Sequence, residues 1–165
     1  MHNGETKDDI KLACILLLLH LTCWYYLGTN GVVTMTATPV RWAVNGHYYE
    51  AEAPTTWDDA RAESLARGGY LVTITSADEN TFVYNLLPGV GVWLGASDIG
   101  YGAKNFHWVD GPEAGQSINS YSPWDTGQPD NWNGNEPVLM MHANGLWNDN
   151  DPNQQLHYVT EFAGT

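Results

Sequence analysis

The chain has 165 residues with 19 acidic and 6 basic side chains, and its net charge of −13 rules against nucleic acids and anionic membranes as partners, because their phosphates would repel it. The length permits one folded domain. An apolar content of 43%, with 8 Trp and 9 Tyr, is enough for a packed core and excludes a disordered chain.

Residues 1–36 differ in composition from the rest of the chain. An apolar run over residues 12–27, broken only by one His and one Thr, is short for a membrane span and suits the core of a secretory signal peptide. The residues before it are not clearly basic, and no A-x-A-like cleavage site precedes Ala37, so a membrane anchor is an alternative. In either case we expect residues 37–165 to form a domain that is secreted or otherwise extracellular.

Both cysteines, Cys14 and Cys23, lie in this N-terminal segment, so the predicted domain contains none. Its stability must then rest on the apolar core and on any ion that it binds. A lipid anchor at Cys23 is a further alternative, although the preceding His20-Leu21-Thr22 fits such a signal poorly.

Strands are predicted before, between and after two helices. Residues 41–50 are β-rich, with Asn45-Gly46 as the turn of a hairpin. Further strands are predicted at 70–74, 90–96, 106–109 and 156–162. The last of these alternates between apolar and polar residues, and we expect it to pair with the first strand. Trp93 and Trp108 lie in apolar strands, which predicts that they pack in the core.

The two helices are predicted from their start signals. Thr56 and Ser76 each stand three residues before an acidic residue, a pattern typical of helix N-caps. The first helix carries Trp57, Ala60 and Leu65 and ends at Gly68-Gly69. The second helix has an apolar stripe formed by Phe82, Val83, Leu86 and Leu87.

The most informative stretch is G-Q-P-D-N-W-N-G-N-E at residues 127–136, which is too polar and too rich in Gly and Asn for a helix or strand. The apolar residues 137–142 that follow predict a buried strand. Ala143-Asn144-Gly145 then predicts a tight turn that returns the chain antiparallel. Such a hairpin brings Asn148-Asp149 back beside Glu136.

Five oxygen-donating side chains therefore converge. They are the carboxylates of Asp130, Glu136 and Asp149 and the amides of Gln128 and Asn148. This set suits a hard cation with about 6–8 oxygen ligands and offers nothing soft to zinc or copper, so it predicts a calcium site. The histidines are scattered singly, so we interpret them as structural or surface residues: His47, His107, His142 and His157.

These residues resemble the C-type lectin domains, in which a Glu-Pro-Asn or Gln-Pro-Asp loop, a later Glu and a Trp-Asn-Asp strand hold one calcium ion. Glu136 and Asn148 lie eight and twenty positions after Gln128, which is similar to the register of the sugar-binding members. The resemblance covers about residues 42–162. It implies an α+β, C-type lectin-like fold, with two helices packed on small antiparallel sheets and a long calcium-binding loop region. The lack of cysteines resembles bacterial members.

The resemblance also implies calcium-dependent carbohydrate binding, in which two neighbouring sugar hydroxyls coordinate the ion and hydrogen-bond to its ligands. The order Gln128-Pro129-Asp130, with a cis proline, is similar to the members that bind galactose or N-acetylgalactosamine. Such members also place a Trp at the position of Trp132, where the indole stacks on the sugar. The implied sugar-binding residues are Gln128, Asp130, Trp132, Glu136 and Asn148.

The resemblance leaves other functions open, namely calcium-dependent ice binding or a protein-binding module. An auxiliary calcium site is conceivable at Asp110, Glu113 and Asp125 in the long loop 110–127, although Pro137 stands where an acidic ligand is expected. We expect no enzymatic activity, because carboxylates gathered on calcium cannot stay protonated as a glycosidase acid requires, and no G-x-S-x-G motif is present. The oligomeric state is open.

Overall fold

The computed structural model describes residues 24–27, 33–36 and 38–164. They belong to two units that divide between Thr38 and Pro39. In the first unit, β1 (Trp24–Leu27) pairs antiparallel with β2 (Val33–Thr36). Residues 1–23, with both cysteines, lie outside the described residues, so the signal-peptide or anchor assignment stays a prediction. The part of the chain that the structure describes contains no helix with the length and hydropathy of a membrane span.

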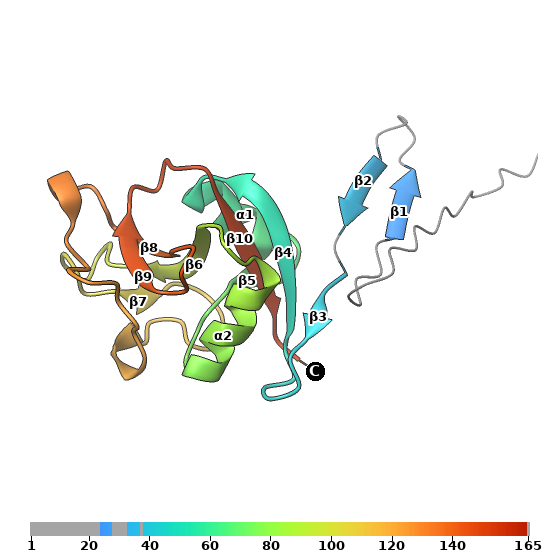
Figure 1. The fold of residues 1–165 in the computed structure, drawn as a ribbon, viewed down its shortest axis with the longest axis horizontal. Helices are drawn as coiled ribbons and strands as arrows, with labels where there is room; N and C mark the ends of the chain where they lie inside the picture. Colours follow the sequence, from blue (N-terminus) through green and yellow to red (C-terminus); the bar gives the residue numbers. More distant parts are fainter. Residues whose placement is uncertain (1–23, 28–32, 37, 165) are drawn as a thin grey trace, which may run out of the picture. The chain divides into compact units, whose positions relative to one another are not determined.

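The second unit has the α+β architecture that the sequence predicts (Figure 1). Its strands are β3 (Val40–Arg41), β4 (Tyr48–Thr55), β5 (Tyr70–Leu71), β6 (Val92–Ser97), β7 (His107–Trp108), β8 (Val138–Met141), β9 (Trp147–Asn150) and β10 (Leu156–Phe162). Its helices are α1 (Trp57–Ala66) and α2 (Ala77–Leu86), with two 3-10 turns, η1 (Ile118–Ser120) and η2 (Trp132–Gly134). The sheet order is β3-β4-β10-β6-β8-β9, with β5 beside β10 and β7 beside β6. The pairings are antiparallel except for the short parallel pairing of β10 with β6.

Both helices begin where their caps predict. The Thr56 hydroxyl accepts a hydrogen bond from the backbone N–H of Asp59, and the Ser76 hydroxyl accepts one from Glu79. One detail of α1 differs from the sequence interpretation, because Leu65 is 46% exposed. The buried position one turn after Ala60 is instead Ser64, whose hydroxyl lies 2.9 Å from that of Thr160. A helix residue four positions after a buried one stays on the same face, whereas the fifth turns away from it.

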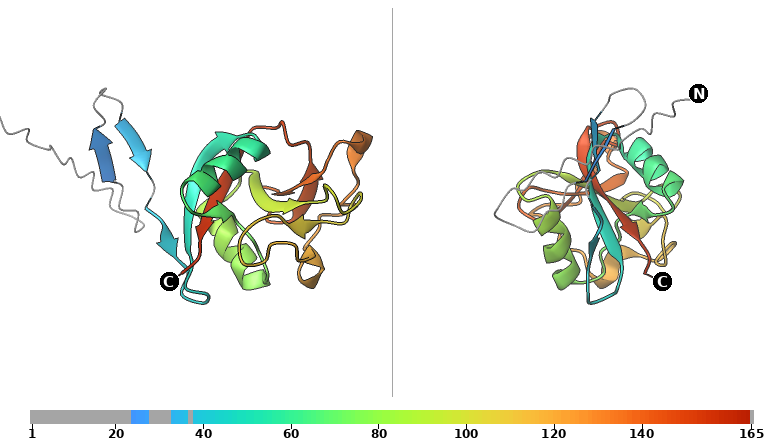
Figure 2. Two further views of the ribbon diagram at one scale, coloured as in Figure 1. Left: turned by 180° about the vertical axis from the view of Figure 1, so that it is seen from behind. Right: turned by 90° about the vertical axis from the view of Figure 1, so that its right-hand side faces the viewer.

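The sheet separates two apolar cores, because successive residues of a strand face opposite sides. In β10, Tyr158 contacts the core of α1 while Val159 contacts the core of α2. The strand β8 repeats this alternation, with Val138 and Met140 on the first side and Leu139 and Met141 on the second. Figure 2 shows the two helices on opposite sides of β4 and β10. Trp93 and Trp108 are both buried, as predicted, one in each core.

The predicted pairing of the first and last strands is confirmed. β4 and β10 are antiparallel, with Tyr49 opposite Glu161. The predicted strand 70–74 is regular only over β5, since the backbone N–H of Thr73 donates to the Glu161 carboxylate instead of to a neighbouring strand. Glu161 also accepts from the Tyr49 hydroxyl and lies 2.6 Å from the His47 imidazole. Burial raises the pKa of Glu161, and the hydrogen bond from His47 lowers it in part. This polar cluster therefore connects the beginning of the domain, at His47 and Tyr49, with its last strand.

Candidate metal-binding site

The polar loop 127–136 is brought to its partners by a hairpin. β8 and β9 form the predicted antiparallel hairpin, with Leu139 opposite Asp149 and Met140 opposite Asn148. The turn between them closes with a hydrogen bond from the N–H of Gly145, which has a positive φ of 84°, to the carbonyl of His142. The hairpin therefore carries Asn148 and Asp149 back toward the start of β8, which lies two residues after Glu136.

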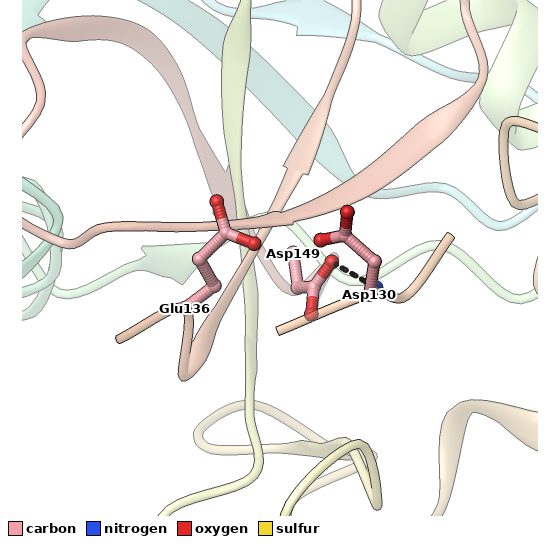
Figure 3. Close-up of side chains that lie close together, drawn as sticks. All are labelled: Asp130, Glu136 and Asp149. Atoms are coloured by element: carbon pink, nitrogen blue, oxygen red, sulfur yellow. Dashed lines mark hydrogen bonds between the residues drawn. The ribbon is translucent and has the colours of Figure 1, made fainter. Parts of the chain in front are cut away.

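Three carboxylates meet at this point (Figure 3). One ligand atom each from Asp130, Glu136 and Asp149 lies within 4.8 Å of the others. Asp130 is exposed, Glu136 is partly buried and Asp149 is fully buried, so the cluster opens to solvent on one side. An opening of this kind leaves room for a ligand to reach an ion that the cluster holds.

The buried carboxylate of Asp149 organises the loop. It accepts hydrogen bonds from the backbone N–H groups of Asp130, at 3.1 Å, and of Asn131, at 2.7 Å. The N–H of Trp132 lies near two further acceptors, 3.1 Å from Asp130 Oδ1 and 2.7 Å from Glu136 Oε2. The N–H groups of three consecutive loop residues thus face the carboxylates, and an irregular loop acquires a defined shape.

Asn131 is a residue of the site that the sequence interpretation missed. Its backbone is left-handed, with φ of 52°, and its side-chain oxygen accepts a hydrogen bond from the N–H of Glu136. Asn adopts this conformation more readily than most residues, so the D-N-W-N-G composition held the signal. Asn131 closes the loop so that Glu136 returns toward Asp130.

The electrostatics of the cluster favour an added cation. Burial, followed by the neighbouring carboxylates of Asp130 and Asp149, raises the pKa of Glu136, while the N–H of Trp132 lowers it in part. Three acidic groups so close together repel one another when all are ionised. A bound cation relieves this repulsion and keeps the three groups ionised.

The two amides also fit a metal ion. Asn148 is buried and its Oδ1 has no hydrogen-bond partner, while its Nδ2 donates to the carbonyl of Asp149. A buried oxygen without a hydrogen-bond partner is energetically costly, and a bound cation would supply a partner for it. Gln128 Oε1 accepts from the N–H of Asp130 at 2.9 Å. The peptide bond between Gln128 and Pro129 is cis, as expected from the resemblance.

The remaining predicted residues separate into two groups. The backbone N–H of Trp132 faces the cluster, and the residue is 69% exposed. The conceivable auxiliary site at Asp110, Glu113 and Asp125 is not assembled. Asp110 pairs with Arg61, Glu113 accepts from the Thr73 hydroxyl, and Asp125 accepts from Asn144. Within residues 38–164 only the cluster of Asp130, Glu136 and Asp149 has the geometry of a metal-ligating acidic group.

Comparison with known proteins identifies the family. The family described as Lectin C-type domain matches residues 53–162, about two thirds of the chain. The chain belongs to the C-type lectin family. The match spans both helices and the whole loop 127–136, so the acidic cluster lies inside the lectin domain.

Individual relatives are about one third identical to this chain over the aligned residues. The chain is 36% identical over 104 residues to C-type lectin domain family 4 member G of Mus musculus, covering 62% of the chain and 34% of the relative. It is 31% identical over 152 residues to C-type lectin domain family 10 member A of Homo sapiens, covering 87% of the chain and 46% of the relative. The chain thus spans less than half the length of these curated relatives.

A solved structure confirms the fold. The crystal structure of the cow C-type carbohydrate-recognition domain of CD23, in the presence of a GlcNAc2Man3 oligosaccharide, matches with a TM-score of 0.65 and 28% identity. The match covers 79% of this chain and 98% of the cow domain. The expected C-type lectin-like fold is therefore confirmed over nearly the whole length of a separately solved domain.

Replacing Glu136 by Gln tests the cluster. We expect Glu136→Gln to lower the affinity for calcium by roughly tenfold or more, because one of three ionised oxygen donors is lost while the shape of the side chain is kept. Isothermal titration calorimetry with calcium measures the change. Glu113→Gln is the matched control, since Glu113 bonds to Thr73 away from the cluster, and it should bind calcium like the unmodified protein. Equal calcium affinities for the two variants would contradict the assignment.

Proposed function

We propose that this lectin domain binds carbohydrate through a calcium ion held by Gln128, Asp130, Glu136, Asn148 and Asp149. The observation that carries the proposal is the meeting of three carboxylates within 4.8 Å beside the unpartnered, buried oxygen of Asn148. Oxygen ligands of this number and charge suit calcium better than a transition metal. The C-type lectin family consists in general of non-enzymatic binding modules, in keeping with this role.

A bound calcium ion would supply a positive centre to which two neighbouring sugar hydroxyls can coordinate. The side chains of the site would form hydrogen bonds with the same hydroxyls. A carboxylate such as Glu136 can accept a hydrogen bond from a sugar hydroxyl, while the amide N–H of Gln128 or Asn148 can donate one to a hydroxyl oxygen. One set of side chains therefore holds both the ion and the sugar. The related cow domain was crystallised in the presence of an oligosaccharide, which supports the ligand class.

Within this proposal, we infer a preference for galactose or N-acetylgalactosamine over mannose. The amide of Gln128 precedes Pro129 and the carboxylate of Asp130 follows it, so donor and acceptor are placed on defined sides of the loop. The exposed indole of Trp132 adds an apolar surface next to them. Galactose has a continuous patch of C–H groups on one face, which can stack on such a ring.

We also infer that the domain works outside the cell, as a secreted or membrane-anchored protein, with residues 1–36 as signal or anchor and residues 37–165 as the lectin domain. Its net charge of −13 supports a partner that is neither nucleic acid nor an anionic membrane. A calcium-rich exterior would keep a weak calcium site loaded.

The direct test is retention on immobilised sugars. We expect calcium-dependent retention on galactose and weaker retention on mannose, with an affinity for free galactose of about millimolar, because one monosaccharide offers few contacts. Washing with a chelator should release the protein. Equal retention on both resins would contradict the galactose preference. Loss of all sugar retention, with a protein partner captured in chelator, would show a protein-binding module.

A reciprocal substitution tests which side chains set the preference. Gln128→Glu combined with Asp130→Asn keeps the total charge of the loop and exchanges its donor and acceptor sides. The oxygen of residue 128 can still accept from the N–H of residue 130, so the loop shape should persist. We expect the preference to move from galactose toward mannose with little change in calcium affinity. An unchanged preference on a glycan array would place the sugar elsewhere.

Acid should release calcium. The raised pKa of Glu136 without metal means that protons occupy it at a higher pH than an ordinary Glu, and only its ionised form binds the ion. Galactose binding and melting temperature should therefore fall together as pH decreases at low calcium, and added calcium should move the midpoint to lower pH. In chelator, the pH dependence of stability that Glu136 contributes has the opposite sign. Its contribution is fully present below the pKa of the unfolded chain and is lost as pH rises through the raised pKa of the folded protein. A binding midpoint independent of calcium would contradict the site.

A further inference from the structure

A second exposed apolar surface follows β6. In the loop that connects β6 to β7, Ile99 is 68% exposed and Tyr101 is 47% exposed. The Tyr101 ring is stacked on the imidazole of His107, with ring centroids 3.7 Å apart and an angle of 14° between the planes. The side chains of Ile99, Tyr101 and His107 are called the aromatic platform below. Single exposed apolar residues are common, but here a stacked ring pair and an exposed Ile belong to one loop and the strand that follows it.

The loop that carries the aromatic platform is held in shape by its own hydrogen bonds. Asp98 Oδ2 accepts from the N–H of Lys104 at 2.7 Å, and the Ser97 hydroxyl accepts from the N–H of Ile99 at 3.1 Å. The N–H of Tyr101 donates to the Asp98 carbonyl, and the Tyr101 carbonyl accepts from the Asn105 amide. These hydrogen bonds involve the backbone of Tyr101 and not its ring, whose stacking partner is His107. A ring held in place in advance loses little entropy when it binds a ligand.

The aromatic platform lies at the same end of the sheet as Glu136. Ser97, at the end of β6, pairs with Val138 on one side and with His107 on the other. The N–H of Asp98 donates to the carbonyl of Pro137, which directly follows Glu136. Two strand spacings separate β8 from β7, so His107 is about 10 Å across the sheet from the start of β8. Figure 1 shows β6, β7, β8 and β9 grouped on one side of the domain, with β3 on the other.

The chemistry of the aromatic platform differs from that of the carboxylate cluster. The aromatic platform offers a flat apolar surface, whereas the carboxylate cluster is suited to sugar hydroxyls. Together they match the two kinds of surface on a pyranose ring, which has an apolar C–H face and polar edges. A glycan anchored by its terminal residue at the carboxylates extends away from them. The aromatic platform is placed where an inner residue of the same chain can lie.

We propose that Tyr101, stacked on His107, binds the apolar face of an inner sugar residue, so that the domain selects oligosaccharides over the single terminal sugar. This inference rests on the proposed carbohydrate function, because the glycan is anchored at the carboxylate cluster. It assigns a ligand class to a surface outside that cluster. The class is an oligosaccharide of two or more residues with a terminal sugar that the cluster accepts.

The experiment compares galactose with a panel of galactose-terminated di- to tetrasaccharides by isothermal titration calorimetry in saturating calcium. We expect at least one oligosaccharide to bind the unmodified protein more tightly than galactose. Tyr101→Ala should lower the affinity for that oligosaccharide about fivefold, the effect expected from the loss of one stacked ring. It should leave the affinity for galactose unchanged. Tyr101→Phe should retain the advantage, because the ring face and not the hydroxyl makes the contact.

Tyr48→Ala is the matched control. Tyr48 is 41% exposed, similar to Tyr101, and lies on β4 opposite Arg41 of the edge strand β3. It should change neither affinity. Galactose binding with no oligosaccharide advantage, or an advantage that Tyr101→Ala leaves intact, would overturn the aromatic platform while the proposed function stands. Absence of calcium-dependent binding to galactose and to every oligosaccharide would overturn both.

Discussion

The carboxylate of Asp149 is the constraint on which the binding region depends. It is fully buried in β9, and the loop 127–136 supplies it with two backbone N–H donors, those of Asp130 and Asn131. These two bonds attach the loop 127–136 to β9. A buried carboxylate without such donors would cost several kcal/mol in lost solvation, so loop and strand stabilise one another. The same carboxylate faces Glu136 and Asp130, so one residue both shapes the loop and contributes to the candidate metal site.

Around this loop, the domain is closed without disulfides, since residues 38–164 contain no cysteine. β4 and β10 pair along most of their length, and His47 just before β4 and Tyr49 near its start contact Glu161 near the end of β10. Burying Glu161 has an electrostatic cost that His47, Thr73 and Tyr49 offset by donating hydrogen bonds to it. Apolar residues that alternate between the two sides of β6, β8 and β10 supply the remaining cohesion.

The rigid elements and the irregular ones have separate roles. The sheet positions the start of β8 and the end of β6 side by side, through the pairing of Ser97 with Val138 and the hydrogen bond from Asp98 to Pro137. The loops that leave this end of the sheet carry the exposed rings of Trp132 and Tyr101 and the carboxylate of Asp130. Loops on a rigid scaffold can present polar and apolar groups together without disturbing either core.

The sequence by itself determined the features that depend on local chemistry. These include the two helix caps, the hairpin of β8 and β9, and the convergence of Asp130, Glu136 and Asp149, because each follows from residue type and short spacing. Only the tertiary structure decided that Ser64 and not Leu65 is buried, and that Asp110, Glu113 and Asp125 have separate partners. It also decided that Tyr101 stacks on His107, beside the strand that pairs with β8. These outcomes depend on which distant segments meet, and that is set by the packing of the whole sheet and not by neighbours in the chain.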